Sequence, residues 1–169
     1  MAVIELRVLT PDDWPAWREL RLAALAEAPQ AFGSRLADWQ GDGDREQRWR
    51  DRLGIPGSYN VIAVLDGQPA GMASGVPAEG DDGAAELISM WVSPAARGRG
   101  VGDRLVRAVE EWARHAGAGV LKLAVTEGNA SAVALYQRRG FADTGELGDL
   151  MPDGVRREHV MAKLLTTRP

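Results

Sequence analysis

The chain has 169 residues, of which 45% are hydrophobic and 26% are charged, a balance typical of a globular protein that folds as one domain over residues 1–169. It has no cysteine and two histidines, so disulfides and thiolate nucleophiles are excluded and no metal site is expected. The net charge of -4 argues against a nucleic-acid partner, because phosphate binding usually requires a basic surface.

The sequence contains no sign of a membrane segment. No apolar run approaches the roughly 20 residues that span a bilayer, and the first residues lack a basic leader followed by an apolar core. We therefore expect a cytoplasmic protein without a membrane partner.

The first third of the chain predicts a strand and two helices. Residues 3–9 alternate apolar and polar side chains, as a half-buried strand does. A helix is expected over residues 11–28, because Thr10 is suited to cap its start and Pro29 ends it. A second helix is expected over residues 44–53 after a looser stretch.

The remaining two thirds predict an alternation of strands and helices. Asp66-Gly67 between two apolar runs predicts a β-hairpin. Residues 85–94 form the most apolar strand candidate, and a helix ending near residue 115 follows it. The pattern then gives a strand over 120–125, a helix over 129–140, and a final antiparallel pair over 141–148 and 157–165.

Between the apolar strand and its helix lies a turn with the sequence RGRGVG, residues 97–102. Unpaired N–H groups and the helix dipole make such a helix start an anion site, and glycines let a phosphate approach the backbone. A Rossmann G-x-G-x-x-G is absent, because the third glycine would fall on Asp103 or Leu105, and no P-loop Gly-Lys-Ser/Thr exists. A merely flexible turn is the remaining alternative to a pyrophosphate cradle.

The run from Arg97 to Gly102 resembles the Gln/Arg-x-x-Gly-x-Gly/Ala signature of the GNAT superfamily of acyl-CoA-dependent N-acyltransferases. Residues 86–96 resemble the central strand of that family, and residues 127–141 resemble its Asn-x-x-Ala-x-x-Leu-Tyr-x-x-x-Gly-Phe segment. The resemblance covers essentially the whole chain. It implies a single-domain α/β fold, with a mixed twisted sheet of about seven strands, a splayed central strand and about four flanking helices.

The resemblance also implies acetyl-CoA as co-substrate. Its pantetheine arm would pair with the backbone of the central strand, as an added strand does, and its pyrophosphate would bind N–H groups of the turn. Either arginine of the turn is expected to contact phosphate or to face solvent, and the asparagine is expected to cap its helix and contact the arm. The expected binding residues are Met90, Trp91, Val92, Arg97, Gly98, Arg99, Gly100, Val101, Gly102, Asp103 and Asn129.

Two residues are catalytic candidates. By resemblance, Tyr136 protonates the departing thiolate of coenzyme A; the alternative is a core tyrosine on the helical face of Ala132 and Val133. Glu86 is the candidate base, acting directly or through water, and its alternative role is that of a surface carboxylate. The N–H of Val92 is expected to meet the oxyanion that forms on the thioester carbonyl.

The function that follows is transfer of an acetyl group to a primary amine of a small molecule, by direct attack in a ternary complex. Acetylation of protein lysines or N-termini is an enzyme alternative, and acyl-CoA sensing is a non-enzyme alternative. Ala124 stands where a branch that acetylates N-termini commonly has Glu, which disfavours that substrate. The acceptor, the length of the acyl group and the oligomeric state stay open, although homodimers are frequent in this superfamily.

The acceptor pocket is expected to come from the first two helices and the last hairpin, within residues 26–39 and 145–158. Charged or aromatic side chains there are candidates to hold the amine. They are Asp38, Trp39, Asp149 and Asp153. The second histidine, His159, alternates with apolar residues in the last strand and is expected to be structural.

Overall fold

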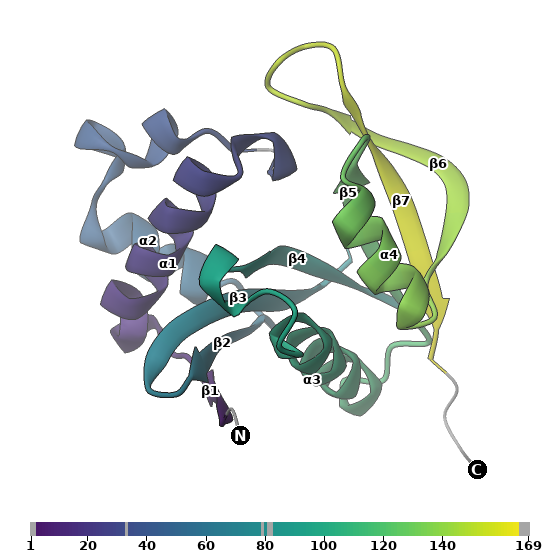
Figure 1. Ribbon diagram of the computed structural model, residues 1–169, viewed down its shortest axis with the longest axis horizontal. Helices are drawn as coiled ribbons and strands as arrows, with labels where there is room; N and C mark the ends of the chain where they lie inside the picture. The colour runs from purple at the N-terminus through teal and green to yellow at the C-terminus, as the bar shows by residue number, and fades with distance from the viewer. Residues whose placement is uncertain (1–2, 33, 79, 81–82, 166–169) are drawn as a thin grey trace.

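The computed structural model describes residues 3–32, 34–78, 80 and 83–165. Within them lies a seven-stranded mixed sheet in the spatial order β1-β2-β3-β4-β5-β7-β6, flanked by helices (Figure 1). The strands are β1 (Ile4–Val8), β2 (Tyr59–Leu65), β3 (Gln68–Pro77), β4 (Ala84–Val92), β5 (Val120–Thr126), β6 (Ala142–Leu150) and β7 (Arg157–Leu164). The α-helices are α1 (Trp14–Glu27), α2 (Glu46–Leu53), α3 (Val101–His115) and α4 (Ala130–Arg138).

The fold expected from the sequence is confirmed, including the order of its strands and helices. The differences lie in short turns. Pro11–Asp13 forms a 3₁₀ turn before α1, and further 3₁₀ turns at Pro29–Ala31, Leu36–Trp39 and Gly41–Gly43 fill the stretch between α1 and α2. Turns of three or four residues are too short to produce a helical repeat of apolar side chains, so the pattern did not reveal them.

The two faces of the sheet carry separate hydrophobic clusters. Alternate residues of a strand point to opposite faces, so Val61 and Ala63 of β2 pack under α3 and α4, whereas Ile62 and Val64 pack under α1 and α2. Figure 1 shows α1 and α2 on one side of β4 and α3 and α4 on the other. Each pair of helices therefore rests on its own core.

The central strand β4 separates from its parallel neighbour β5. Only the first four residues of β4, Ala84–Leu87, pair with β5, and the rest of β4 pairs with β3 alone. The register between β3 and β4 shifts beside Ser89, which has a φ of 55°, a left-handed conformation that marks a bulge. The bulge bends β4, and the predicted splayed strand is confirmed.

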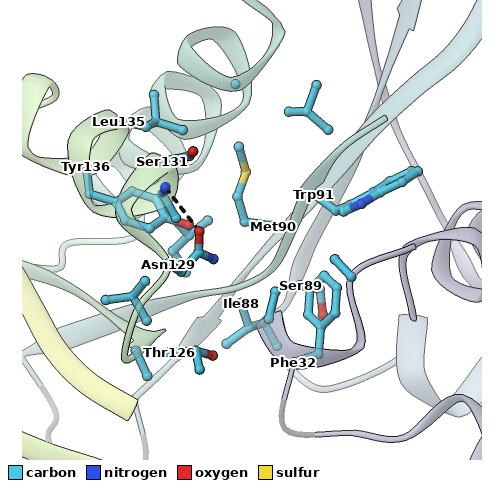
Figure 2. A pocket seen from close by; sticks show the side chains of 18 of the residues that line it. Phe32, Ile88, Ser89, Met90, Trp91, Thr126, Asn129, Ser131, Leu135 and Tyr136 are labelled. Carbon is cyan, nitrogen blue, oxygen red and sulfur yellow. Dashed lines mark hydrogen bonds between the residues drawn. The ribbon is translucent and has the colours of Figure 1, made fainter. Parts of the chain in front are cut away.

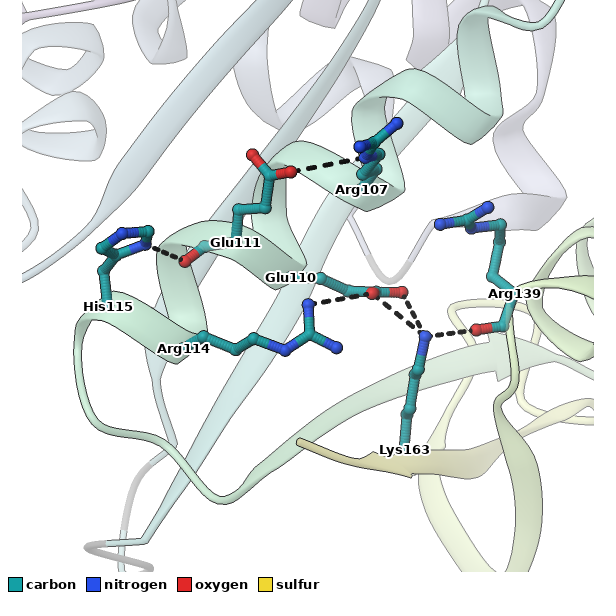
Figure 3. A network of polar contacts seen from close by, with 7 residues as sticks. All are labelled: Arg107, Glu110, Glu111, Arg114, His115, Arg139 and Lys163. Carbon is teal, nitrogen blue, oxygen red and sulfur yellow. Dashed lines mark hydrogen bonds and ion pairs between the residues drawn. The ribbon is translucent and has the colours of Figure 1, made fainter. Parts of the chain in front are cut away.

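A network of polar contacts joins β7 to α3 and to the end of α4 (Figure 3). Lys163 of β7 donates to both carboxylate oxygens of Glu110 at 3.0 Å and to the carbonyl oxygen of Arg139 at 2.6 Å. Arg114 approaches the same carboxylate at 3.6 Å. Because Arg139 ends α4, the network positions the helix that carries Tyr136.

Gly75 of β3 permits the close approach of α3 to the sheet. A Cβ at this position would lie 2.4 Å from two ring atoms of Trp112, well inside van der Waals contact. We expect Gly75→Ala to cost about 1–3 kcal/mol of stability and to lower Tm by roughly 3–10 °C, measured by thermal unfolding. Gly119→Ala is the matched control, because its Cβ would meet its nearest atom at 3.8 Å; equal Tm values for the two variants would contradict the packing argument.

Candidate active site

A cavity of about 1030 Å³ lies where β4 and β5 separate. Its walls come from the ends of β4 and β5, the start of α3, one face of α4, and residues of α1, α2 and β7. Figure 2 shows β4 on one side of this space and the side chains of Asn129 and Tyr136 on the other. The cavity thus joins the expected acetyl-CoA side to the expected acceptor side.

The β4 edge that faces the gap contains the three backbone positions expected to bind pantetheine, and Met90, Trp91 and Val92 all line the cavity. The N–H of Ser93 donates to the carbonyl oxygen of Ala70 in β3 at 2.8 Å. Successive N–H groups of a strand point to opposite neighbours, so the N–H of Val92 points away from β3, toward the gap. The side chain of Trp91 is instead buried in the core under α1 and α2.

The glycine-arginine turn has an open backbone at the start of α3. Gly98 and Gly100 have φ values of 78° and 86°, which favour glycine, and a Cβ on either would meet nothing within 4 Å. Helix α3 begins at Val101, and its first N–H groups have no partner within the helix. Gly102 serves packing instead, because its Cβ would lie 3.1 Å from Leu135 of α4.

The charged side chains of the turn differ in their surroundings. Arg97 donates to the carbonyl oxygen of Val92 at 3.2 Å and forms an ion pair with Glu27 at the end of α1. Asp103 pairs with Arg138 of α4 at 3.2 Å. Arg99 is exposed and is not among the residues that line the cavity. The open N–H groups, rather than a free arginine, are the clearest anion-binding feature of the turn.

Helix α4 presents Asn129 and Tyr136 to the cavity. The Oδ1 atom of Asn129 accepts a hydrogen bond from the N–H of Ala132 at 3.3 Å, which confirms the predicted N-cap. Tyr136 is 7% exposed, and its ring lies edge-on to Phe141 with a centroid separation of 5.9 Å. Burial raises the pKa of the Tyr136 phenol, so the phenol keeps its proton at neutral pH.

The acidic residues that line the cavity include Glu86 of β4 and Glu158 of β7. The candidate base Glu86 lies beside β5, opposite Lys122 in the strand register. Burial raises the pKa of Glu158, and the negative charges of Asp149 and Glu86 raise it further. Sequence reasoning missed Glu158; its place at the end of the expected acceptor segment was the only signal for it.

A family model for the acetyltransferase (GNAT) family matches residues 14–141, more than half of the chain. The chain belongs to the GNAT acetyltransferase family. The family resemblance expected from the two motifs is thereby confirmed. GNAT enzymes use acetyl-CoA as co-substrate.

Two curated acetyltransferases are similar to this GNAT chain. An IAA acetyltransferase from Azospirillum brasilense is 41% identical over 101 residues, which cover 60% of this chain and 65% of that protein. A mycothiol acetyltransferase from Renibacterium salmoninarum is 31% identical over 140 residues, which cover 82% of this chain and 40% of that protein. The chain therefore spans less than two thirds of the length of either relative.

The fold is similar to that of a solved GNAT-like structure. A protein from Salmonella typhimurium, solved with its cofactor acetyl-CoA, superposes with a TM-score of 0.77 at 22% identity. The superposition covers 99% of this chain and 96% of that one. The likeness establishes a common fold.

The expected acceptor side of the cavity is built from α1, α2 and the segment between them. Its lining includes Trp17 and Arg21 of α1, Phe32, and Trp49 and Arg52 of α2. None of these was named as a site residue from the sequence, although the first two helices and the segment that contains Phe32 were expected to form this side. Arg21 had a visible signal, because it lies one helical turn after Trp17 on the apolar face of α1.

The acceptor candidates taken from the sequence lie in different places. Trp39 lines the cavity and packs against Trp49 with a centroid separation of 4.6 Å, whereas Asp38, Asp149 and Asp153 do not line it. Asp153 accepts hydrogen bonds from the N–H groups of Val155 and Arg156 at 2.9 Å, which lower its pKa to about 2. Asp153 therefore stabilises its own loop.

Among residues 3–32, 34–78, 80 and 83–165, no group of three or more His, Asp or Glu side chains is arranged to hold a metal ion. In the same part of the chain, no helix combines the length and the apolar character needed to cross a bilayer.

Proposed function

We propose that this GNAT chain transfers an acetyl group from acetyl-CoA to a primary amine of a small molecule, within one catalytic domain spanning residues 1–169. The observation that carries the proposal is the single cavity at the splay of β4 and β5. It reaches both the open helix start at Gly100 and the buried phenol of Tyr136. The two relatives, an IAA acetyltransferase and a mycothiol acetyltransferase, support a small-molecule acceptor.

The residues of the turn fit a pyrophosphate. Gly98 and Gly100 leave open space beside the N–H groups that begin α3, where the helix dipole favours an anion. The pantetheine arm would pair with the β4 edge at Met90, Trp91 and Val92, which lacks a neighbouring strand on that side. The Salmonella typhimurium protein of the same fold carries acetyl-CoA, which supports this placement.

The amine must lose a proton before it attacks. With a pKa near 10.4, an alkylamine is neutral in roughly one molecule in 2,500 at pH 7, a cost of about 4.6 kcal/mol. Glu86 takes this proton, directly or through water, since it lines the cavity. The nitrogen then forms a bond to the thioester carbon, while the N–H of Val92 stabilises the oxyanion.

The intermediate collapses as the C–S bond breaks. The thiolate of coenzyme A leaves and receives the proton of the Tyr136 hydroxyl. The buried phenol holds that proton at neutral pH. The attacking nitrogen releases its second proton as the neutral amide forms, and this proton restores the phenol, directly or through water. No covalent intermediate on the protein is required, in agreement with a sequence that has no cysteine.

Substituting Glu86 and Glu158 one at a time shows which of the two carboxylates is the base. We expect Glu86→Gln to lower kcat/KM about 100-fold and to remove the acidic limb of its pH profile, because the proton acceptor is lost. Glu158→Gln removes a neighbouring negative charge and should have a much smaller effect. Thiol release, followed from pH 5 to 10, measures both; the larger loss in Glu158→Gln would assign the base to Glu158 instead.

The proposed function is tested first by calorimetric titration with acetyl-CoA, with NADH and ATP as controls. We expect binding of acetyl-CoA alone, and then thiol release with members of a panel of small amines. Release only with peptides would favour the protein acetyltransferase, and binding without release would favour acyl-CoA sensing. Absence of binding would overturn the proposal. A cytoplasmic location and a homodimer stay predictions.

A further inference from the structure

Two arginines of the cavity have no acidic partner in the part of the chain that the structure describes. Arg21 of α1 and Arg52 of α2 both line the acceptor side, and no ion pair joins either to a carboxylate among the described residues. Arg21 is 9% exposed, and its guanidinium makes no hydrogen bond there; the NH1 atom is buried without a partner. Its guanidinium carbon lies 4.7 Å from the centroid of the Phe32 ring.

Arg52 contacts neutral groups. It donates to Oδ1 of Asn60 and to the hydroxyls of Ser74 and Ser89, each at 3.1 Å, and it lies over the ring of Trp17 at 5.0 Å. These bonds hold the β4 bulge at Ser89 and keep the half-buried Arg52 in place. These neutral groups do not compensate the positive charge of Arg52. That charge lowers the pKa of Arg21.

Both side chains stay cationic at neutral pH. Burial lowers the pKa of each to about 10, and the nearby Arg52 charge lowers that of Arg21 as well. Buried charges in proteins are usually paired, because an unpaired charge loses its hydration and gains no stabilising interaction in exchange. Neither of these two like charges has an ion-pair partner among the described residues, so a bound anion would compensate them.

Two carboxylates near α1 and α2 are already engaged with other partners. Glu27 binds Arg97 and accepts from the indole N–H of Trp91, and Asp44 binds Arg18 and the indole N–H of Trp49. A further buried donor, the indole N–H of Trp17, lies one helical turn from Arg21 and also lacks a partner. Buried donors are normally satisfied, so unpaired donors and charges gather on one wall of the cavity.

We propose that the amine acceptor also carries a carboxylate, which Arg21 and Arg52 bind, so that the substrates are amino acids. The inference rests on the proposed acetyl transfer. A guanidinium matches a carboxylate with two parallel hydrogen bonds, and the aromatic walls of Trp17, Phe32 and Trp49 provide contact for an apolar side chain. Ser89, which Arg52 holds, lies in β4 between Glu86 and Val92. The carboxylate is thus bound beside the proposed reacting groups.

The test compares amino acids with their decarboxylated amines, such as phenylalanine with phenethylamine and lysine with cadaverine. A site whose buried polar groups need a partner strongly rejects an analogue that lacks it. We expect kcat/KM for thiol release to be about 100-fold higher for the acid of each pair. Equal values, or a preference for the amines, would overturn this inference while leaving acetyl transfer standing. Failure of acetyl-CoA to bind would instead overturn the proposed function.

Substitutions of Arg21 test whether this arginine causes the preference for the acid over the amine. Arg21→Met should reduce the acid-to-amine ratio of kcat/KM at least about tenfold, whereas Arg21→Lys, which keeps the charge, should retain part of it. Arg107→Met is the matched control, since Arg107 is exposed on α3 and pairs with Glu111. An unchanged ratio in Arg21→Met would contradict the assignment, and a weaker acetyl-CoA affinity in that variant would assign the arginine to coenzyme A.

Thermal unfolding gives a readout without turnover. Because Arg21 is buried and unpaired, Arg21→Met should raise Tm by a few degrees, and phenylalanine should raise Tm of the unaltered protein but not of the variant. A lower Tm in Arg21→Met, with no shift by phenylalanine in either protein, would show that Arg21 is structural.

Discussion

Gly100→Glu is expected to abolish binding of acetyl-CoA while the fold remains intact. The new carboxylate would stand at the N-cap of α3, where the pyrophosphate is proposed to bind, and like charges placed together cost several kcal/mol. We expect Kd to rise at least about 100-fold, measured by calorimetric titration.

The fold tolerates this change because a Cβ on Gly100 meets nothing within 4 Å. The backbone has a φ of 86°, so a residue with a side chain costs about 1 kcal/mol there. Gly117→Glu is the matched control: Gly117 follows the other end of α3, has a φ of 85° and has the same open surroundings. Equal affinities in the two variants would refute the pyrophosphate site.

Tyr136→Phe is expected to lower kcat by about 100-fold to 1,000-fold while the affinity for acetyl-CoA stays nearly unchanged. The substitution removes the proposed proton donor and keeps the ring that packs against Phe141. Steady-state thiol release measures kcat, and titration measures the affinity. Tyr59→Phe is the matched control, because Tyr59 is the other tyrosine and stacks on Trp112.

The raised pKa of Tyr136 predicts how turnover depends on pH. A proton donor works only while it is protonated, and burial raises the pKa of this phenol above its ordinary value near 10. We therefore expect no loss of kcat from this group as pH rises to about 10. Unchanged kcat in Tyr136→Phe would return the residue to a purely structural role in the core.

Local patterns in the sequence predicted the helices and strands and the residues of the proposed acetyl-CoA side of the cavity. The turn around Gly100 could be recognised because its chemistry depends on neighbouring residues: strand, glycines and helix follow one another within the chain. The N-cap at Asn129 is equally local, since its partner Ala132 is three residues away. Short-range hydrogen bonds and helix starts are the features that a sequence displays directly.

The acceptor side depends on contacts between distant residues, and the sequence could not show them. Arg97 pairs with Glu27, 70 residues earlier, so its engagement was invisible in the turn. Arg21 and Arg52 come together only when α1 and α2 pack on β3 and β4. An arginine on an apolar helix face can equally extend its charge to solvent, and only the packed structure distinguishes the two cases.

The division of the core by the sheet has a consequence for the evolution of this protein. The proposed donor side rests on the cluster under α3 and α4, and the proposed acceptor side rests on the cluster under α1 and α2. Substitutions at sites without shared contacts add nearly independently. At positions of α1 and α2 other than Glu27 and Arg52, which contact the turn and β4, a lineage can therefore change the proposed amine substrate without passing through ancestors that have lost the acyl donor.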